Sequence, residues 1–285
     1  MKSVSITPGK NNVGAYINDI NLNNLNNDLT GQIKDILNKY GVIFIKKQSL
    51  DSGAYQNFAK SIGQLVEYPR LKGLENFPYI NVLERKPSDK SLAFGGSWLH
   101  QDTSYLEKDR PRYTMLMGIE IPVGQGNTIF SSGFNAYKNL PDEIKQKIKN
   151  AIGVFSSAGP ISKTRIELEK RAGIQSSKVL EAEHPIVQEV NGQKSLYVSP
   201  GHLIKIKNID ESEKIKNFLI DHVNKDEFIF SYEWSKGDLV LWDNLSVMHK
   251  ASEIKNCSRI MHRITICLLY TSPSPRDRQK SRMPS

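Results

Sequence analysis

The feature that most constrains the fold of this chain is a series of short apolar stretches separated by glycine, proline and asparagine. From Tyr79 onward these stretches recur at nearly regular spacing, which is typical of an all-β sandwich or barrel. Helical patterns are too few and too irregular to alternate with the strands, as a wound parallel sheet requires. We therefore predict a mainly β (α+β) fold of the jelly-roll type with flanking helices. The predicted strands are residues 79–83, 113–121, 127–131, 153–157, 185–189, 195–198, 227–232, 238–242, 247–249 and 259–266.

Before this series, the sequence predicts two strands and two helices. The strands are residues 15–18 and the apolar run 41–47. Apolar residues at helical spacing between them predict a helix with Thr30 as its N-cap and Gly41 as its C-terminal stop. A second helix is expected after Asp51, whose side chain suits an N-cap.

Two further helices interrupt the β series. One is expected to begin at Pro141, because proline is favoured in the first helical turn. In the other, Asp210 and Glu213 have the spacing of a capping box, and Ile215 and Leu219 follow on one face.

Composition limits the classes of protein to which the chain can belong. Of its 285 residues, 24% are charged and 38% are hydrophobic, as in ordinary globular proteins. No apolar run approaches the roughly 18 residues of a membrane span, and the polar N-terminus does not resemble a secretory signal. Cys257 and Cys267 form neither a disulfide framework nor a zinc motif. A reducing, cytoplasmic location is the simplest expectation.

The net charge of +9 raises the question of nucleic-acid binding. The basic residues are scattered and form no stripe with interleaved aromatic side chains, so we expect neither nucleic acid nor membrane as a partner. The sequence leaves open whether the chain forms a homo-oligomer.

The last 18 residues, LLYTSPSPRDRQKSRMPS (268–285), differ in composition from the rest of the chain. They are rich in serine, proline and arginine and have no apolar periodicity, whereas the body is rich in isoleucine, asparagine and lysine. We interpret residues 268–285 as a non-native read-through tail, with a disordered native tail as the alternative. Residues 1–267 are expected to form a single domain.

The segment WLHQDTSY contains two potential metal ligands, His100 and Asp102. If the segment is a strand, residues two apart point to the same face, so an imidazole and a carboxylate converge. His249, which follows the predicted strand 238–242, is the best candidate for a third ligand. Two histidines and one carboxylate form the site of non-haem Fe(II) oxygenases. Taken alone, a structural or surface His–Asp pair explains the pattern equally well.

Two arginines follow His249 in the last predicted strand. Arg259 and Arg263 are four residues apart and therefore share one face of a strand. If that face is the interior, an anionic partner such as a dicarboxylate is expected, because buried guanidinium groups need one. If it is the exterior, the arginines are ordinary surface residues. Thr128, after a glycine-rich turn, is a further candidate hydrogen-bond donor, although such a turn is also common in hairpins.

Together these motifs resemble the taurine/2,4-dichlorophenoxyacetate dioxygenase family of Fe(II)- and 2-oxoglutarate-dependent oxygenases. The resemblance begins at VGAYINDINLNNL and continues to about Ile266. It includes GVIFIKKQSL with FAKSIGQL, WLHQDTSY, YTMLMGIEIPVGQGNTIFSSGFNAYKNLP, HPIVQEVNGQKSLYVSPGH, WSKGDLVLWDNLSVMH and RIMHRITI, in the order of the family.

The resemblance implies a double-stranded β-helix (jelly-roll) core and a dioxygenase reaction. Its cofactor is Fe(II), its co-substrates are 2-oxoglutarate and O2, and its products include succinate and CO2 beside a hydroxylated small, anionic organic molecule. By the same resemblance, His100, Asp102 and His249 are the catalytic metal ligands. Thr128 and Arg259 are expected to hold the distal carboxylate of 2-oxoglutarate. Arg263 is expected near its other carboxylate and near the anionic group of the substrate.

The chain also departs from the family pattern. Where taurine-specific members have a histidine before a proline, this sequence has Tyr68. The run Gly95-Gly96 replaces a polar residue, and Leu99 is inserted between the tryptophan and the histidine of the metal motif. Taurine is therefore in doubt as the substrate. Candidate substrate residues are Tyr68, Trp98, Tyr105 and Arg263.

The remaining histidines are given structural or surface roles. His184 is expected at a strand start, His202 and His222 on the surface, and His262 on the strand face opposite the two arginines. Two other functions stay open. One is a binding protein that has kept the barrel without turnover, and the other is an oxygenase that modifies a macromolecule.

Overall fold

The computed structural model describes residues 3–68, 71–89, 98–108, 110–162 and 178–267 and the single residues 166 and 170. The predicted tail 268–285 and the run Gly95-Gly96 lie outside the described residues. In the part of the chain that is described, no helix is long and apolar enough to cross a membrane.

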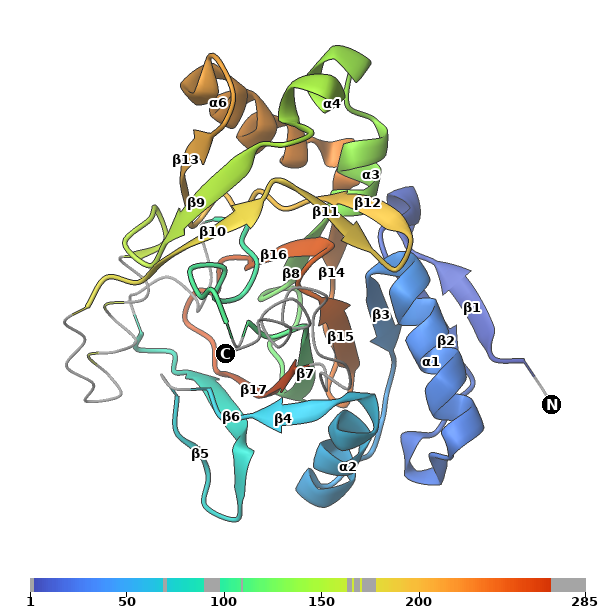
Figure 1. Ribbon diagram of the computed structural model, residues 1–285. Helices are drawn as coiled ribbons and strands as arrows, with labels where there is room; N and C mark the ends of the chain where they lie inside the picture. The colour runs from blue at the N-terminus through green and yellow to red at the C-terminus, as the bar shows by residue number, and fades with distance from the viewer. Residues whose placement is uncertain are drawn as a thin grey trace, which may run out of the picture.

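In one large sheet, the C-terminal strand lies between two other strands and not at an edge (Figure 1). The sheet is antiparallel except where β2 pairs with β3. Because β17 pairs with β7 on one side and β6 on the other, the two faces of its residues are fixed. In sheet order the strands are β1 (Ser5–Pro8), β2 (Ala15–Asn18), β3 (Val42–Ile45), β15 (Leu239–Asp243), β7 (Tyr113–Glu120), β17 (Arg259–Cys267), β6 (Phe77–Arg85) and β5 (Gly73–Leu74), with β4 (Gln64–Val66) on β17.

Smaller antiparallel sheets complete the fold. They are β14 (Ile229–Tyr232), β8 (Thr128–Ser132) and β16 (Val247–Ala251); β10 (Glu181–Pro185), β9 (Ile152–Ser156) and β13 (Leu203–Lys207); and the hairpin of β11 (Val187–Val190) and β12 (Gln193–Leu196). This is the mainly β, jelly-roll arrangement that the strand pattern predicts. The single strand predicted at 185–189 is wrong, because β10 ends at Pro185 and β11 begins at Val187.

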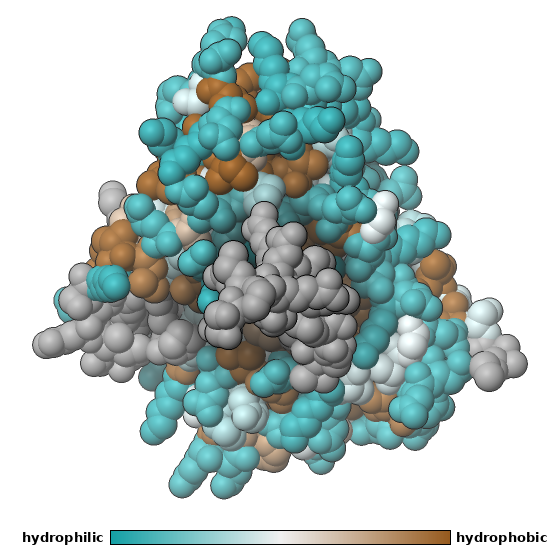
Figure 2. Space-filling view, viewed as in Figure 1, coloured by the Kyte–Doolittle hydropathy of each residue, from teal (hydrophilic) through white to brown (hydrophobic). Residues whose placement is uncertain are grey.

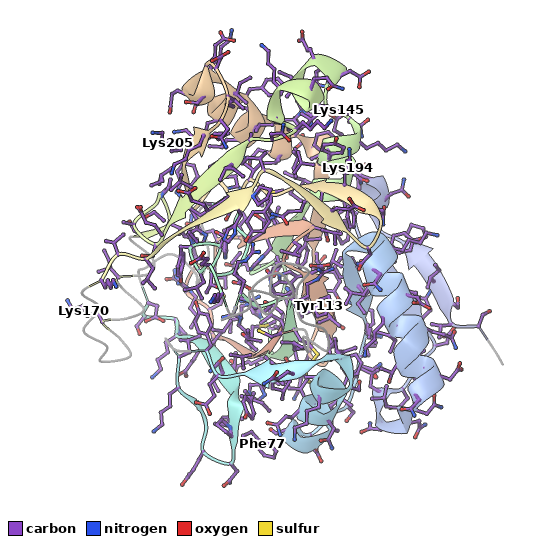
Figure 3. All side chains as sticks on the ribbon, viewed as in Figure 1. Phe77, Tyr113, Lys145, Lys170, Lys194 and Lys205 are labelled. Carbon is purple, nitrogen blue, oxygen red and sulfur yellow. The ribbon has the colours of Figure 1, made fainter. Side chains whose placement is uncertain are left out.

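Among the described helices, α1 (Asn27–Tyr40) and α2 (Ser52–Ile62) cover one side of the large sheet (Figure 1). At the opposite end of the molecule lie α3 (Gly133–Lys138), α4 (Asp142–Ile148) and α6 (Ser212–Val223). Short 3-10 turns are η1 (Lys10–Asn12), η2 (Leu22–Asn24) and η3 (Asp226–Phe228). Figure 2 shows mostly hydrophilic side chains at the α4 and α6 end, where Figure 3 labels Lys145 and Lys205.

The ends of α1 and α2 confirm part of the capping prediction. Gly41 ends α1 in the left-handed conformation with φ 75°, and Asp51 caps α2 by accepting from Ala54 N. Thr30 as N-cap of α1 is wrong, because the helix begins one turn earlier. Asn26 accepts from Leu29 N, while the Thr30 hydroxyl donates to Asn26 O inside the helix.

The capping box predicted for α6 is also wrong. The residue before the helix is Glu211, which adopts a left-handed conformation and makes no side-chain capping bond. Pro141 does mark the beginning of α4, where it occupies the position just before Asp142.

Alternation along the strands separates two cores. On β3, Ile43 and Ile45 pack with α1 and α2, whereas Val42 and Phe44 face the barrel interior. The same alternation applies to β17, where Ile264 and Ile266 join the helix-covered core and Met261 joins the interior one. Arg259 and Arg263 share the parity of Met261 and are buried, 8% and 2% exposed. The last strand therefore directs both arginines into the barrel.

Candidate active site

Backbone hydrogen bonds hold the two histidines of the site together. His100 N donates to His249 O at 3.0 Å, and His249 N donates to His100 O at 2.9 Å. This isolated antiparallel bridge joins the motif at 98–105 to β16. Two residues far apart in the sequence therefore present their imidazoles side by side, with ring centroids 4.4 Å apart.

Asp102 reaches the histidines through a turn. His100 forms the bridge, but residues 102–105 form turns, and Thr103 has φ 45°. The segment is therefore not a strand at Asp102, and the two side chains converge through the turn instead. The inserted Leu99 is accommodated in the core beside α3 and α4, and its carbonyl accepts from Gly201 N.

The three side chains bring their donor atoms within 4.8 Å of one another. Oδ1 of Asp102 lies 3.9 Å from Nε2 of His100 and 3.8 Å from Nε2 of His249. His100 donates from Nδ1 to the Trp98 carbonyl at 3.0 Å, so the lone pair of its Nε2 faces the cluster. All three residues are buried.

The protonation states of His100, Asp102 and His249 suit the binding of a divalent cation. Burial lowers the pKa of His249 to about 3, with His100 as a further cause, and burial also lowers the pKa of His100. Burial alone would raise the pKa of Asp102, but Arg263 and the two histidines hold it well below its usual range. Neutral imidazoles beside an ionised carboxylate are the donor set of a metal centre.

The cluster lies in a cavity of about 430 Å³, a volume that includes its opening to solvent. The lining residues bring together every residue predicted for the metal and the co-substrate, with apolar side chains around them. They are Leu83, His100, Asp102, Leu116, Thr128, Trp242, His249, Ala251, Arg259 and Arg263.

Arg259 and Thr128 offer donors in this cavity. Nε and Nη2 of Arg259 are buried without a hydrogen-bond partner among the described residues, and burial lowers the pKa of Arg259 to about 10. Thr128 Oγ1 accepts from Trp234 Nε1 at 2.9 Å, which leaves its own hydrogen for another acceptor. A Cβ at Gly126 would lie 3.0 Å from Arg259 Cδ, so a larger residue at this position would crowd the Arg259 side chain.

Arg263 contacts the metal-ligand cluster directly. Its Nη2 lies 2.9 Å from Oδ2 of Asp102, and its guanidinium lies 4.3 Å from the centre of the Tyr68 ring. Thr114 Oγ1 donates to the same Asp102 oxygen at 2.6 Å. Oδ2 thus accepts from Thr114 and is ion-paired with Arg263, while the other oxygen, Oδ1, faces the histidines.

The predicted substrate residues differ in their position relative to the cavity. Tyr68 is half-buried against Arg263, Trp98 is 40% exposed, and Tyr105 is buried against the His202 ring. Among the described residues that line the cavity, only Arg263 comes from this set.

The surface positions predicted for two histidines are wrong. His202 is 5% exposed, and its Nδ1 is in hydrogen-bond contact with Ser104 Oγ and Ser199 Oγ behind the metal turn. His222 is 2% exposed and bonds the Ala136 carbonyl. His184 lies at the end of a strand, where its Nε2 contacts the carbonyls of Ser104 and Leu106.

Two polar residues near Asp102 were not singled out from the sequence. Thr114 is buried in β7, next to Tyr113, which Figure 3 labels near the middle of the view. Asn244 follows β15 in the segment WDNLSVMH that also carries His249. Nothing in the sequence indicates that either contacts Asp102, because both contacts depend on the pairing of distant strands.

Comparisons with known proteins identify the family of the chain. Residues 5–265 match the family described as "Taurine catabolism dioxygenase TauD, TfdA family". An alkylsulfatase of Acinetobacter baylyi is 29% identical over 89% of this chain and 82% of its own length. An alpha-ketoglutarate-dependent sulfate ester dioxygenase of Pseudomonas putida is 26% identical over 92% and 89%.

Solved structures show the same fold. The crystal structure of a putative alpha-ketoglutarate-dependent taurine dioxygenase from Burkholderia xenovorans superposes with a TM-score of 0.76, at 24% identity over 93% of this chain and 92% of that one. The jelly-roll prediction is thereby confirmed.

The family match and the curated relatives define an alpha-ketoglutarate-dependent dioxygenase, and the His-Asp-His cluster is a donor set that suits such an enzyme. Since the family model matches nearly the whole described chain, the protein belongs to the TauD/TfdA family of 2-oxoglutarate-dependent dioxygenases. The predicted enzyme class is thereby confirmed.

Proposed function

We propose that this dioxygenase binds Fe(II) through His100, Asp102 and His249 and hydroxylates a small organic molecule that carries an anionic group. The observation that carries the proposal is the cluster itself. Two neutral imidazoles and one ionised carboxylate converge on one point of a buried cavity, and this donor set fits Fe(II). When bound, the iron and its co-substrates supply the oxidising chemistry, in which 2-oxoglutarate becomes succinate and CO2 and the substrate gains an oxygen atom.

We assign 2-oxoglutarate to Arg259 and Thr128. A guanidinium buried without a partner is unfavourable, and a carboxylate matches the fork of donors that Arg259 presents. The free hydrogen of Thr128 adds a further donor in the same cavity. The apolar lining beyond them, including the buried Leu116 and the partly buried Leu83, excludes water from the bound co-substrate.

An anionic substrate is supported by Arg263, which adds a buried positive charge beside Asp102. Relatives of this chain are described as acting on sulfate esters, sulfonates and 2,4-dichlorophenoxyacetate. We therefore propose an organic sulfate, sulfonate or carboxylate as the substrate, with Tyr68, Trp98 and Tyr105 as candidate residues around it. A cytoplasmic location is also proposed, supported by the absence of a disulfide between Cys257 and Cys267, the two cysteines of the sequence.

The test is a screen of alkyl sulfates, alkyl sulfonates and aryloxyacetates with Fe(II), 2-oxoglutarate and air. We expect one of these classes to raise succinate formation above the rate without substrate, with one hydroxylated product for each succinate. Arg259→Lys serves as the control for the co-substrate. Succinate formation that no anionic compound stimulates, but that a neutral or cationic one does, would overturn the proposed substrate class.

A further inference from the structure

The side chain of Asn244 is hydrogen-bonded to the main chain of Asp102 and to Thr114, which in turn donates to the Asp102 carboxylate. Asn244 is 2% exposed and is not among the residues lining the cavity. Its Oδ1 accepts from Asp102 N at 3.3 Å and from Trp242 Nε1 at 3.0 Å, and its Nδ2 donates to Thr114 Oγ1 at 2.9 Å. A buried amide is unfavourable unless it is bonded, and here both ends of the amide have partners.

The donor and the acceptor of each of these hydrogen bonds follow from the chemical groups involved. An indole nitrogen and a backbone N–H can only donate, so the oxygen of Asn244 must face Trp242 and Asp102. The amide nitrogen must then donate to Thr114. Since Thr114 Oγ1 accepts this bond, its single hydrogen is directed to Oδ2 of Asp102, 2.6 Å away.

These contacts fix the orientation of the Asp102 carboxylate. Thr114 donates to Oδ2 and Arg263 is ion-paired with it, whereas Oδ1 faces Nε2 of His100 and His249. Asn244 also fixes the main chain of Asp102, which lies in an irregular turn rather than a strand. Its own backbone N donates to Arg112 O, so the turn before β16 is tied to the beginning of β7.

We propose that Asn244 is a positioning residue that, through Thr114, keeps Asp102 a one-oxygen ligand of the metal. It touches neither the metal cluster's donor atoms nor the cavity, and it acts only through Asp102 and Thr114. The inference rests on the proposed metal site. Groups that orient metal ligands in this way commonly contribute about 10- to 100-fold to metal affinity.

The experiment compares Mn(II) binding to the full chain, measured by the electron paramagnetic resonance of free Mn(II), in three variants. Asn244→Asp keeps the shape but replaces the donating amide nitrogen with an acceptor, so Thr114 has to donate to the newly introduced carboxylate in place of Asp102. Thr114→Val removes the hydroxyl, and Thr114→Ser keeps it as the matched control. We expect about tenfold weaker Mn(II) binding for the first two and wild-type binding for Thr114→Ser.

The double variant Asn244→Asp/Thr114→Val tests whether Asn244 acts on Asp102 through Thr114 or affects Mn(II) binding independently of it. If Asn244 acts through Thr114, the double variant binds Mn(II) about as weakly as Thr114→Val alone. Unchanged Mn(II) affinity in Asn244→Asp, or losses that simply multiply in the double variant, would overturn the inference. If the folded wild type itself binds no Mn(II), the proposed metal site fails rather than the role of Asn244.

A second readout does not depend on affinity. At saturating Mn(II), a carboxylate that is free to rotate changes the symmetry around the ion. We expect the spectrum of bound Mn(II) to differ from wild type in Asn244→Asp and Thr114→Val but not in Thr114→Ser. Identical spectra in all of them would contradict the proposed control of Asp102.

Discussion

Nη2 of Arg263 lies 2.9 Å from Oδ2 of Asp102, and both side chains are buried in the barrel. The arginine places a buried positive charge beside a carboxylate that we assign to the metal. It holds the carboxylate ionised and leaves Oδ1 directed at the two histidines. The last strand of the fold therefore contributes to the metal site as well as to the proposed co-substrate site.

Removing this arginine is expected to destabilise the protein more without metal than with it. Breaking a buried ion pair by deleting one partner costs about 3–5 kcal/mol, because the other charge is left uncompensated. A bound divalent cation would compensate Asp102 in place of the guanidinium. In Arg263→Met we therefore expect a lowered unfolding temperature, of which Mn(II) restores a larger part than it adds to wild type. An equal Mn(II) effect on both proteins would show that the two charges are not coupled.

Arg259 is expected to matter for 2-oxoglutarate and not for the metal. Hydrogen bonds to charged groups contribute about 1.5–3 kcal/mol, so Arg259→Ala should weaken 2-oxoglutarate binding by about 10- to 100-fold or more. Calorimetry of 2-oxoglutarate binding in the presence of Mn(II) measures this directly. Thr128→Val should show a smaller loss of the same kind. Normal 2-oxoglutarate affinity in Arg259→Ala would mean that its unpartnered donors serve another ligand.

The stability of the protein should fall as the pH is lowered from about 6.5 to about 4, in part because of His184. Burial, and then Arg110, lower the pKa of His184 to about 4, whereas an unfolded histidine titrates near 6.5. Between these values the unfolded chain binds the additional proton, so the free energy of unfolding decreases as pH falls. Urea unfolding at several pH values should give a shallower pH dependence for His184→Gln than for wild type. Parallel curves for the two proteins would exclude His184 as a contributor.

Two glycines are expected to respond oppositely to alanine. Gly41 ends α1 at φ 75°, and a Cβ there would lie 2.8 Å from Val247 Cγ2 at the beginning of β16. Gly31 lies inside α1 with nothing within 4 Å of an added Cβ. We expect Gly41→Ala to destabilise the fold by about 1–3 kcal/mol and Gly31→Ala to stabilise it by about 0.5–1 kcal/mol. Chemical denaturation measures both, and a neutral Gly41→Ala would contradict the described approach of α1 to β16.

The sequence was most informative where strand periodicity and a short motif coincide. The alternation in 259–266 allowed Arg259 and Arg263 to be assigned to one face, and pairing of β17 on both sides decided that this face is the interior. The convergence of His100 and Asp102 was argued for the case of a strand, but the structure has a turn there, with Thr103 at positive φ. Such a turn depends on tertiary hydrogen bonds that local propensity does not contain.

Other parts of the site could not be predicted because they depend on contacts between distant segments. His202 was expected on the surface, but Ser104 and Ser199 bind it behind the metal turn. Asn244 and Thr114 are 130 residues apart, and only the pairing of β15 with β7 brings them together. The register of paired strands decides such contacts, and no single stretch of sequence records it.

The central claim is that His100, Asp102 and His249 bind Fe(II) in a form that chelates 2-oxoglutarate. The most direct measurement is the anaerobic visible spectrum after addition of Fe(II) and then 2-oxoglutarate, read for the charge-transfer band of a chelated 2-oxo acid. We predict the band in wild type and in His262→Gln, a histidine on the opposite face of β17, and its loss in Asp102→Ala and in His249→Ala. A band that persists unchanged in both ligand variants would contradict the assignment.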